Sequence, residues 1–115
     1  PVPVTERMEY LIRELRRSHP TTPIVAVEHI RLTRLPRPGG DASVEQWERV
    51  NADLGRALER LAAAGIGGIR RVGWQELLGD DEEATVDGIH PTDLGFLRMA
   101  RPISAALDAV LAEKL

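Results

Sequence analysis

Ile24-Val25-Ala26-Val27-Glu28 is the stretch of sequence that decides the fold. Its apolar residues run without interruption and are mostly β-branched, which is typical of a strand buried on both faces of a parallel sheet. A second, weaker strand is predicted over Gly68–Trp74, where Arg70 and Arg71 interrupt the apolar residues. Helical patterns lie before, between and after these two strands.

Three amphipathic helices are predicted from apolar residues that recur every three or four positions. The first covers Thr5–Ser18. The second runs from Ser43, a suitable N-cap, to Ala64, and Gly65 follows as a C-cap. The third begins after the N-cap Thr92, and Pro102 inside it is expected to kink or divide it.

The predicted order of elements is therefore α-β-α-β-α, within one domain over residues 1–115. Helices that cross over between parallel strands are typical of an α/β fold with a doubly wound, flavodoxin-like sheet. Two parallel strands make a poor sheet alone, since independent sheets generally need three or more. We expect this sheet to be completed by another polypeptide, a second copy or a segment outside the chain.

Composition excludes several classes of function. The formal net charge is −3 and the pI is about 5.6, so no nucleic acid or anionic membrane is expected as the main partner. The chain has no cysteine, which excludes thiol catalysis and Cys-based zinc sites. No apolar run approaches the ~20 residues of a membrane span, and no secretory signal is visible, which favours a cytoplasmic location. The first residue, Pro1, fits removal of an initiator Met and fits equally a piece of something longer.

The segment Asp87-Gly88-Ile89-His90-Pro91 carries the chemistry. It follows a strand and opens a helix, which places it at the carboxyl edge of the sheet, where open α/β proteins have their sites. Asp87 can fold back onto the imidazole of His90, accept the Nδ1 proton and leave Nε2 free to take a proton from a nucleophile. The spacing alone also fits an ordinary loop histidine beside a capping aspartate.

The stretch Leu77–Ala100, LLGDDEEATVDGIHPTDLGFLRMA, resembles the last sequence block of the SGNH (GDSL-type) hydrolases. In that family an Asp-x-x-His-Pro loop precedes the C-terminal helix. The resemblance implies that this chain is the C-terminal part of such a domain, with His90 as general base and Asp87 as its orienting carboxylate. It further implies ester hydrolysis through a serine in a Gly-Asp-Ser motif, with a Gly and an Asn as oxyanion donors.

The chain departs from the family pattern at the nucleophile. Its serines are Ser18, Ser43 and Ser104, and none follows Gly-Asp. The only asparagine, Asn51, lies in the middle of a predicted helix and is a poor candidate for an oxyanion donor. We therefore expect a companion chain or segment to carry the serine and the oxyanion donors, and expect this chain alone to be a very poor esterase.

Further residues are candidates for the substrate pocket. Trp74 follows the second strand, Glu28 ends the first strand on the same edge of the sheet, and Ile89 lies between Asp87 and His90. A packing tryptophan and a strand-end charge are the alternative interpretations of Trp74 and Glu28. No metal site is expected, because the other histidines lie far in sequence from a third ligand, and the reaction needs no organic cofactor.

The leading hypothesis is thus an SGNH-type serine hydrolase of carboxylic esters, in which this chain supplies the base and its aspartate. The alternative is a non-catalytic, truncated relative that acts as a binding or assembly module, with Asp87 and His90 as inherited loop structure. A generic nucleotide or response domain is a weaker alternative, since no Gly-rich phosphate loop follows a strand.

Overall fold

The computed structural model describes residues 3–33 and 40–113, without side-chain detail for residues 40–44. Helices and strands alternate as the sequence predicts, which confirms the α/β class. The order along the chain is α1 Val4–Ser18, β1 Ile24–Val27, α2 Gly40–Ala63, β2 Ile69–Val72, a short 3-10 helix η1 Trp74–Glu76, and α3 Asp93–Ala112.

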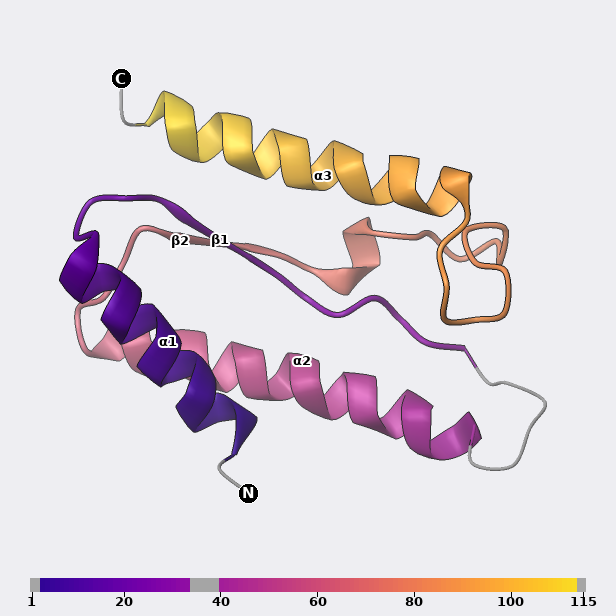
Figure 1. Ribbon diagram of the computed structural model, residues 1–115, viewed down its shortest axis with the longest axis horizontal. Helices are drawn as coiled ribbons and strands as arrows, with labels where there is room; N and C mark the ends of the chain where they lie inside the picture. The colour runs from indigo at the N-terminus through magenta and orange to yellow at the C-terminus, as the bar shows by residue number, and fades with distance from the viewer. Residues whose placement is uncertain (1–2, 34–39, 114–115) are drawn as a thin grey trace.

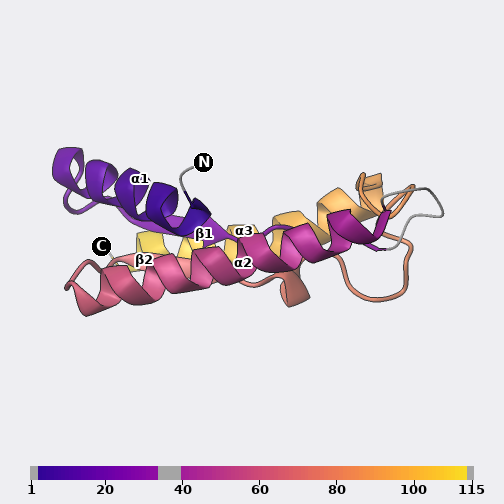
Figure 2. The ribbon, with the colours of Figure 1, turned by 90° about the horizontal axis from the view of Figure 1, so that it is seen from below.

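Among the described residues, β1 and β2 form a two-stranded parallel sheet, with Ile24 opposite Ile69 and Val27 opposite Val72. Helices cover both faces of this sheet (Figure 1), with α1 and α2 on one side and α3 on the other. The helices α1 and α2 pack on each other, and α3 packs on both strands. The view from below shows a thin slab (Figure 2), which is 19 Å along its shortest axis.

The second helix begins earlier than predicted. The structure places its first residue at Gly40, three residues before the expected N-cap Ser43. No proline lies between Pro38 and Ser43, so no residue there blocks an extra helical turn in the way that proline does. The predicted end is confirmed, because Gly65 has φ +79° and its N–H donates to the carbonyl of Ala62, as in a Schellman motif.

Of the two expected effects of Pro102, a kink or a division of the last helix, the division is wrong, because α3 is one uninterrupted helix from Asp93 to Ala112. Proline removes one backbone donor from the helix interior. Packing compensates, since Gly95 before the proline and Ala106 and Val110 after it are all buried. The helix is therefore packed against the rest of the fold on both sides of Pro102, at Gly95 on the segment around Ala84 and at Ala106 on the apolar core.

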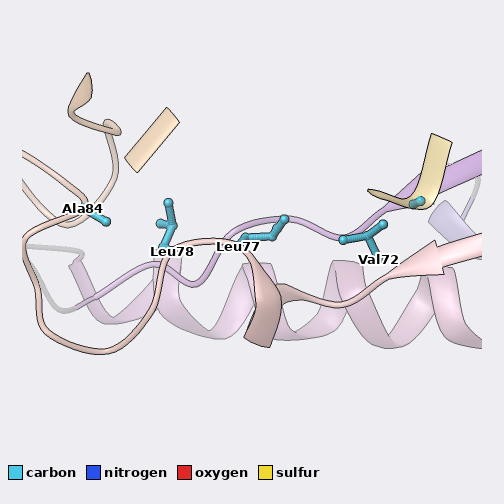
Figure 3. Close-up of a cluster of buried hydrophobic side chains, with 5 residues drawn as sticks. Val72, Leu77, Leu78 and Ala84 are labelled. Atoms are coloured by element: carbon cyan, nitrogen blue, oxygen red, sulfur yellow. The ribbon is translucent and has the colours of Figure 1, made fainter. Parts of the chain in front are cut away.

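A small apolar core lies between the sheet, the segment after it, and α3. Figure 3 shows Val72, Leu77, Leu78 and Ala84 along this segment, and Ala106 of α3 completes the cluster. Leu77 is fully buried and Ala84 is 3% exposed. The core thus anchors the chain at Ala84, immediately before the segment that carries Asp87 and His90.

Candidate active site

Residues Ala84–Thr92 form a short hairpin, which we call the hairpin from here on. The N–H of Thr92 donates to the carbonyl of Ala84 over 2.9 Å, and the N–H of Val86 donates to the carbonyl of His90 over 2.9 Å. Between these hydrogen bonds, Thr85 and Pro91 form an antiparallel bridge. The tip is tight because Gly88 adopts φ +86°, a conformation that favours glycine.

Asp87 and His90, which we call the dyad, contact each other across this tip. The Nδ1 atom of His90 lies 2.6 Å from Oδ2 of Asp87. The other carboxylate oxygen, Oδ1, accepts the backbone N–H groups of Ile89 over 2.9 Å and of His90 over 2.8 Å. The carboxylate therefore binds the backbone and the imidazole of His90 together, which fixes the orientation of the ring.

These hydrogen bonds lower the pKa of Asp87. The backbone N–H of His90 contributes most, followed by its side chain and the N–H of Ile89, and together they bring the pKa from 3.8 to about 2. A carboxyl whose pKa is lower in the folded state stabilises the fold above its unfolded pKa. This contribution is present above about pH 4 and is lost as the pH falls toward 2.

An ionised Asp87 determines what the imidazole can do. A carboxylate only accepts hydrogen bonds, so the proton of neutral His90 must lie on Nδ1. The lone pair of Nε2 is then available to accept a proton. The side chain of His90 is 75% exposed, so a reacting group can approach it from the solvent side.

Three contacts hold the hairpin on the rest of the fold. Thr92 is the N-cap of α3, as predicted: its Oγ1 accepts the N–H of Gly95 over 3.1 Å. The backbone of α3 also approaches the hairpin closely at Gly95, where a Cβ would lie 2.1 Å from the carbonyl oxygen of Ala84. On the other side, the N–H of Thr33 donates to the carbonyl of Gly88 over 3.1 Å, which links the tip to the chain leaving β1.

Glu28 and Trp74 lie close to each other in a different place. The side chain of Glu28 is 5% exposed. Its carboxylate forms an ion pair with Arg71 and accepts a hydrogen bond from the N–H of Trp74 over 2.8 Å. Trp74 packs edge-to-face on Trp47, with ring centroids 5.2 Å apart. Both residues line an open groove of about 310 Å³ whose lining does not include the dyad. The structure therefore does not bring Glu28 and Trp74 together with His90.

Ile89 is the pocket candidate that lies beside the dyad. It is half-buried at the tip of the hairpin, and its N–H is bound to Asp87. A role for Ile89 in substrate binding stays a prediction.

Sequence reasoning missed the role of Asn51. Its side chain lies in a buried position, where Oδ1 accepts the N–H of His29 over 2.8 Å and Nδ2 donates to the carbonyl of His29 over 2.9 Å. Asn51 thus holds the chain where it leaves β1. The same stretch continues to Thr33, whose N–H binds the carbonyl of Gly88 at the tip of the hairpin. An asparagine in the middle of a helix gives no signal in the sequence that its partner is a backbone 22 residues away.

Val86 was missed as well. Its side chain is 77% exposed although it is apolar. Directly opposed residues of an antiparallel pair place their side chains on the same face. Val86 therefore lies beside His90 and gives the exposed face of the hairpin an apolar component.

No group of three or more side chains suited to hold a metal ion occurs within residues 3–33 and 40–113. In the same part of the chain, no helix has the length and apolar character needed to cross a bilayer.

Comparison with known proteins identifies the class. The sequence profile of the GDSL-like lipase/acylhydrolase family matches residues 2–108. The chain therefore belongs to this family, and the resemblance inferred from the Asp-x-x-His-Pro segment is confirmed. No match was found among curated proteins.

Two solved structures resemble the chain. A protein from Bacteroides ovatus described as a GDSL-like lipase is 30% identical, with a TM-score of 0.80 over 95% of this chain and 32% of its own. The salicylyl-acyltransferase SsfX3 from a tetracycline biosynthetic pathway is 17% identical, with a TM-score of 0.64 over 93% of this chain and 32% of its own, and shows likeness of fold alone. The chain thus spans about a third of the length of the structures that it matches.

Proposed function

We propose that this chain supplies the general base of a serine ester hydrolase, with His90 as the base and Asp87 as the carboxylate that orients it. The single observation that carries the proposal is the 2.6 Å contact between His90 Nδ1 and Asp87 Oδ2, which leaves Nε2 as the ring nitrogen not bound to Asp87 on an exposed side chain. Membership of the GDSL-like lipase/acylhydrolase family supports acyl transfer as the reaction class.

The reaction proceeds in two steps. Nε2 of His90 takes the proton of a serine hydroxyl as the serine oxygen forms a bond to the ester carbonyl carbon. The bond from that carbon to the alcohol oxygen then breaks, and the proton passes from Nε2 to the departing alcohol. A water molecule repeats the sequence on the acyl-serine, which releases the acid and restores the serine. The ionised carboxylate of Asp87 stabilises the imidazolium that forms in each step.

We infer that the attacking serine lies outside this chain. Ser18 ends α1 on the side where the chain enters β1, whereas the hairpin follows the opposite, carboxyl ends of the strands. Ser104 lies about three turns along α3, roughly 16 Å from the start of that helix. The side chain of Ser43 lies outside the described residues.

Within the described residues β1 pairs with β2 alone, and its other edge is the place where a segment bearing Gly-Asp-Ser would join the sheet. Ile24 and Glu28 direct their N–H groups to β2, so the backbone groups of Val25 and Val27 face the opposite edge. Val27 is 37% exposed although it belongs to the most apolar strand. On β2, by contrast, Arg70 and Arg71 are exposed, and charges of this kind discourage further pairing.

Exposed apolar side chains on the helices support the same inference. The outer face of α3 carries Phe96, Leu107 and Leu111, which are 58%, 45% and 55% exposed. On α1, Leu11 and Leu15 are 50% and 40% exposed. Several exposed apolar side chains along one helix are typical of surface that another part of an assembly covers, and here such surface lies on both sides of the sheet.

Labelling with a fluorophosphonate, followed by intact mass, tests this proposal. The sample is this chain together with the polypeptide segment that carries Gly-Asp-Ser. The label is expected on a serine of that segment, and His90→Ala is expected to remove it, because the serine then lacks its base. His19→Ala replaces another exposed histidine and serves as the control.

Two results would contradict the proposal. Labelling of Ser18, Ser43 or Ser104 would place the nucleophile within this chain. Self-assembly of this chain alone into a homo-oligomer, with no labelled serine in any preparation, would favour the alternative of a binding or assembly module.

A further inference from the structure

Asp81, one member of the acidic segment Asp80–Glu83, is bound by a side chain of α3. Arg98 reaches from α3 and donates from Nη1 to Asp81 Oδ1 over 2.7 Å and from Nη2 to Asp81 Oδ2 over 2.6 Å. The same Nη1 donates to the carbonyl of Leu78 over 2.8 Å. The side chain of Arg98 is 27% exposed, so this bidentate ion pair is partly shielded from water. Arginine is suited to such a contact because its planar group matches a carboxylate.

The contact between Arg98 and Asp81 lies next to the start of the hairpin. The first strand of the hairpin follows directly after the segment that Arg98 binds, and Thr92 Oγ1 donates to the carbonyl of Glu83 over 3.1 Å. The second strand of the hairpin leads directly into α3 through the cap at Thr92. Both ends of the hairpin are therefore anchored on one helix, covalently at one end and through Arg98 at the other.

We propose that Arg98 is a positioning residue, which fixes the start of the hairpin on α3 and so keeps Asp87 against His90. This inference rests on the proposed function only where it gives the contact between Asp87 and His90 a catalytic use. The position of Asp87 itself can be measured without any reaction. Without Arg98, the segment before Ala84 loses its ion pair with α3 and keeps the weaker hydrogen bond from Thr92 Oγ1 to the carbonyl of Glu83, so the two strands of the hairpin can shift relative to each other. The N–H groups that bind Asp87 Oδ1 then no longer converge on one oxygen.

The experiment measures the pKa of the Asp87 carboxyl by NMR titration in three forms of this chain: unmodified, Arg98→Met and Asp81→Asn. In the unmodified chain we expect a pKa of about 2, because the hydrogen bonds to both carboxylate oxygens of Asp87 hold it there. Both substitutions are expected to raise it toward 3.8, because each removes the same contact. Through-space electrostatics alone would shift the pKa in opposite directions in the two variants. Loss of the Arg98 cation raises the pKa of a nearby carboxyl, and loss of the Asp81 anion lowers it.

Arg17→Met is the matched control, because Arg17 pairs with Glu14 on α1 and lies far from the hairpin in sequence. It is expected to leave the pKa of Asp87 at about 2. Shifts of opposite sign for Arg98→Met and Asp81→Asn, or no shift in either, would overturn the positioning role. Should Arg98→Met fail to fold, Asp81→Asn alone still decides. In that variant, loss of the contact raises the pKa of Asp87, whereas electrostatics alone lowers it. Absence of ester hydrolysis in the assembled enzyme would count against the proposed function and leave this result standing.

Discussion

Replacing His90 by alanine is expected to lower kcat/KM for ester hydrolysis by roughly 10⁴- to 10⁶-fold, the range found when serine-hydrolase triads lose their base. The assay uses p-nitrophenyl acetate and this chain together with the segment that carries Gly-Asp-Ser. The loss is large because the serine then lacks the group that takes its proton. Asp87→Asn is expected to cost about 10⁴-fold, because an amide favours the wrong tautomer of the imidazole.

A control separates loss of the base from loss of the fold. His19→Ala removes an exposed imidazole on the turn after α1 and is expected to leave kcat/KM unchanged. A decrease of less than tenfold for His90→Ala would mean that another group serves as the base.

Substituting Gly95 by alanine is expected to destabilise the fold by about 3 kcal/mol or more, at the upper end of the cost of overfilling a packed site. A Cβ at this position would lie 2.1 Å from the carbonyl oxygen of Ala84 and 3.1 Å from Cβ of Pro91. Backbone cannot move aside as a side chain can, so α3 and the hairpin must separate. The measurement is the free energy of unfolding in urea.

Gly67→Ala is the matched control for this substitution. Nothing lies within 4 Å of a Cβ built at Gly67, and its φ is not in the left-handed region. The free energy of unfolding is therefore expected to stay within about 1 kcal/mol of the unmodified protein. Equal effects of the two substitutions would show that close approach at Gly95 does not hold the hairpin in place.

Much of the fold could be predicted because it depends on local patterns. The apolar run at Ile24–Val27 predicts a buried strand, and the parallel pairing follows from the helix between the strands. The cap at Thr92 and the glycine at Gly65 mark helix ends through their own chemistry. The spacing of Asp87 and His90 predicts their contact because only one tight turn separates them.

The remaining features depend on contacts between distant residues, which no local pattern records. Pro102 is tolerated because packing on both sides holds the helix. Glu28 was a pocket candidate at the end of its strand, yet its carboxylate is bound by Arg71 from the neighbouring strand. The contact between Asp81 and Arg98 links residues 17 positions apart, and the acidic run around Asp81 hides which member is paired.

Nitrogen NMR of the imidazole of His90 near neutral pH tests the central claim most directly. The account predicts that the neutral ring carries its proton on Nδ1, bound to Asp87, with Nε2 unprotonated. A ring protonated on Nε2, or an equal mixture of the two forms, would contradict it, because the nitrogen that should accept the serine proton would already be occupied.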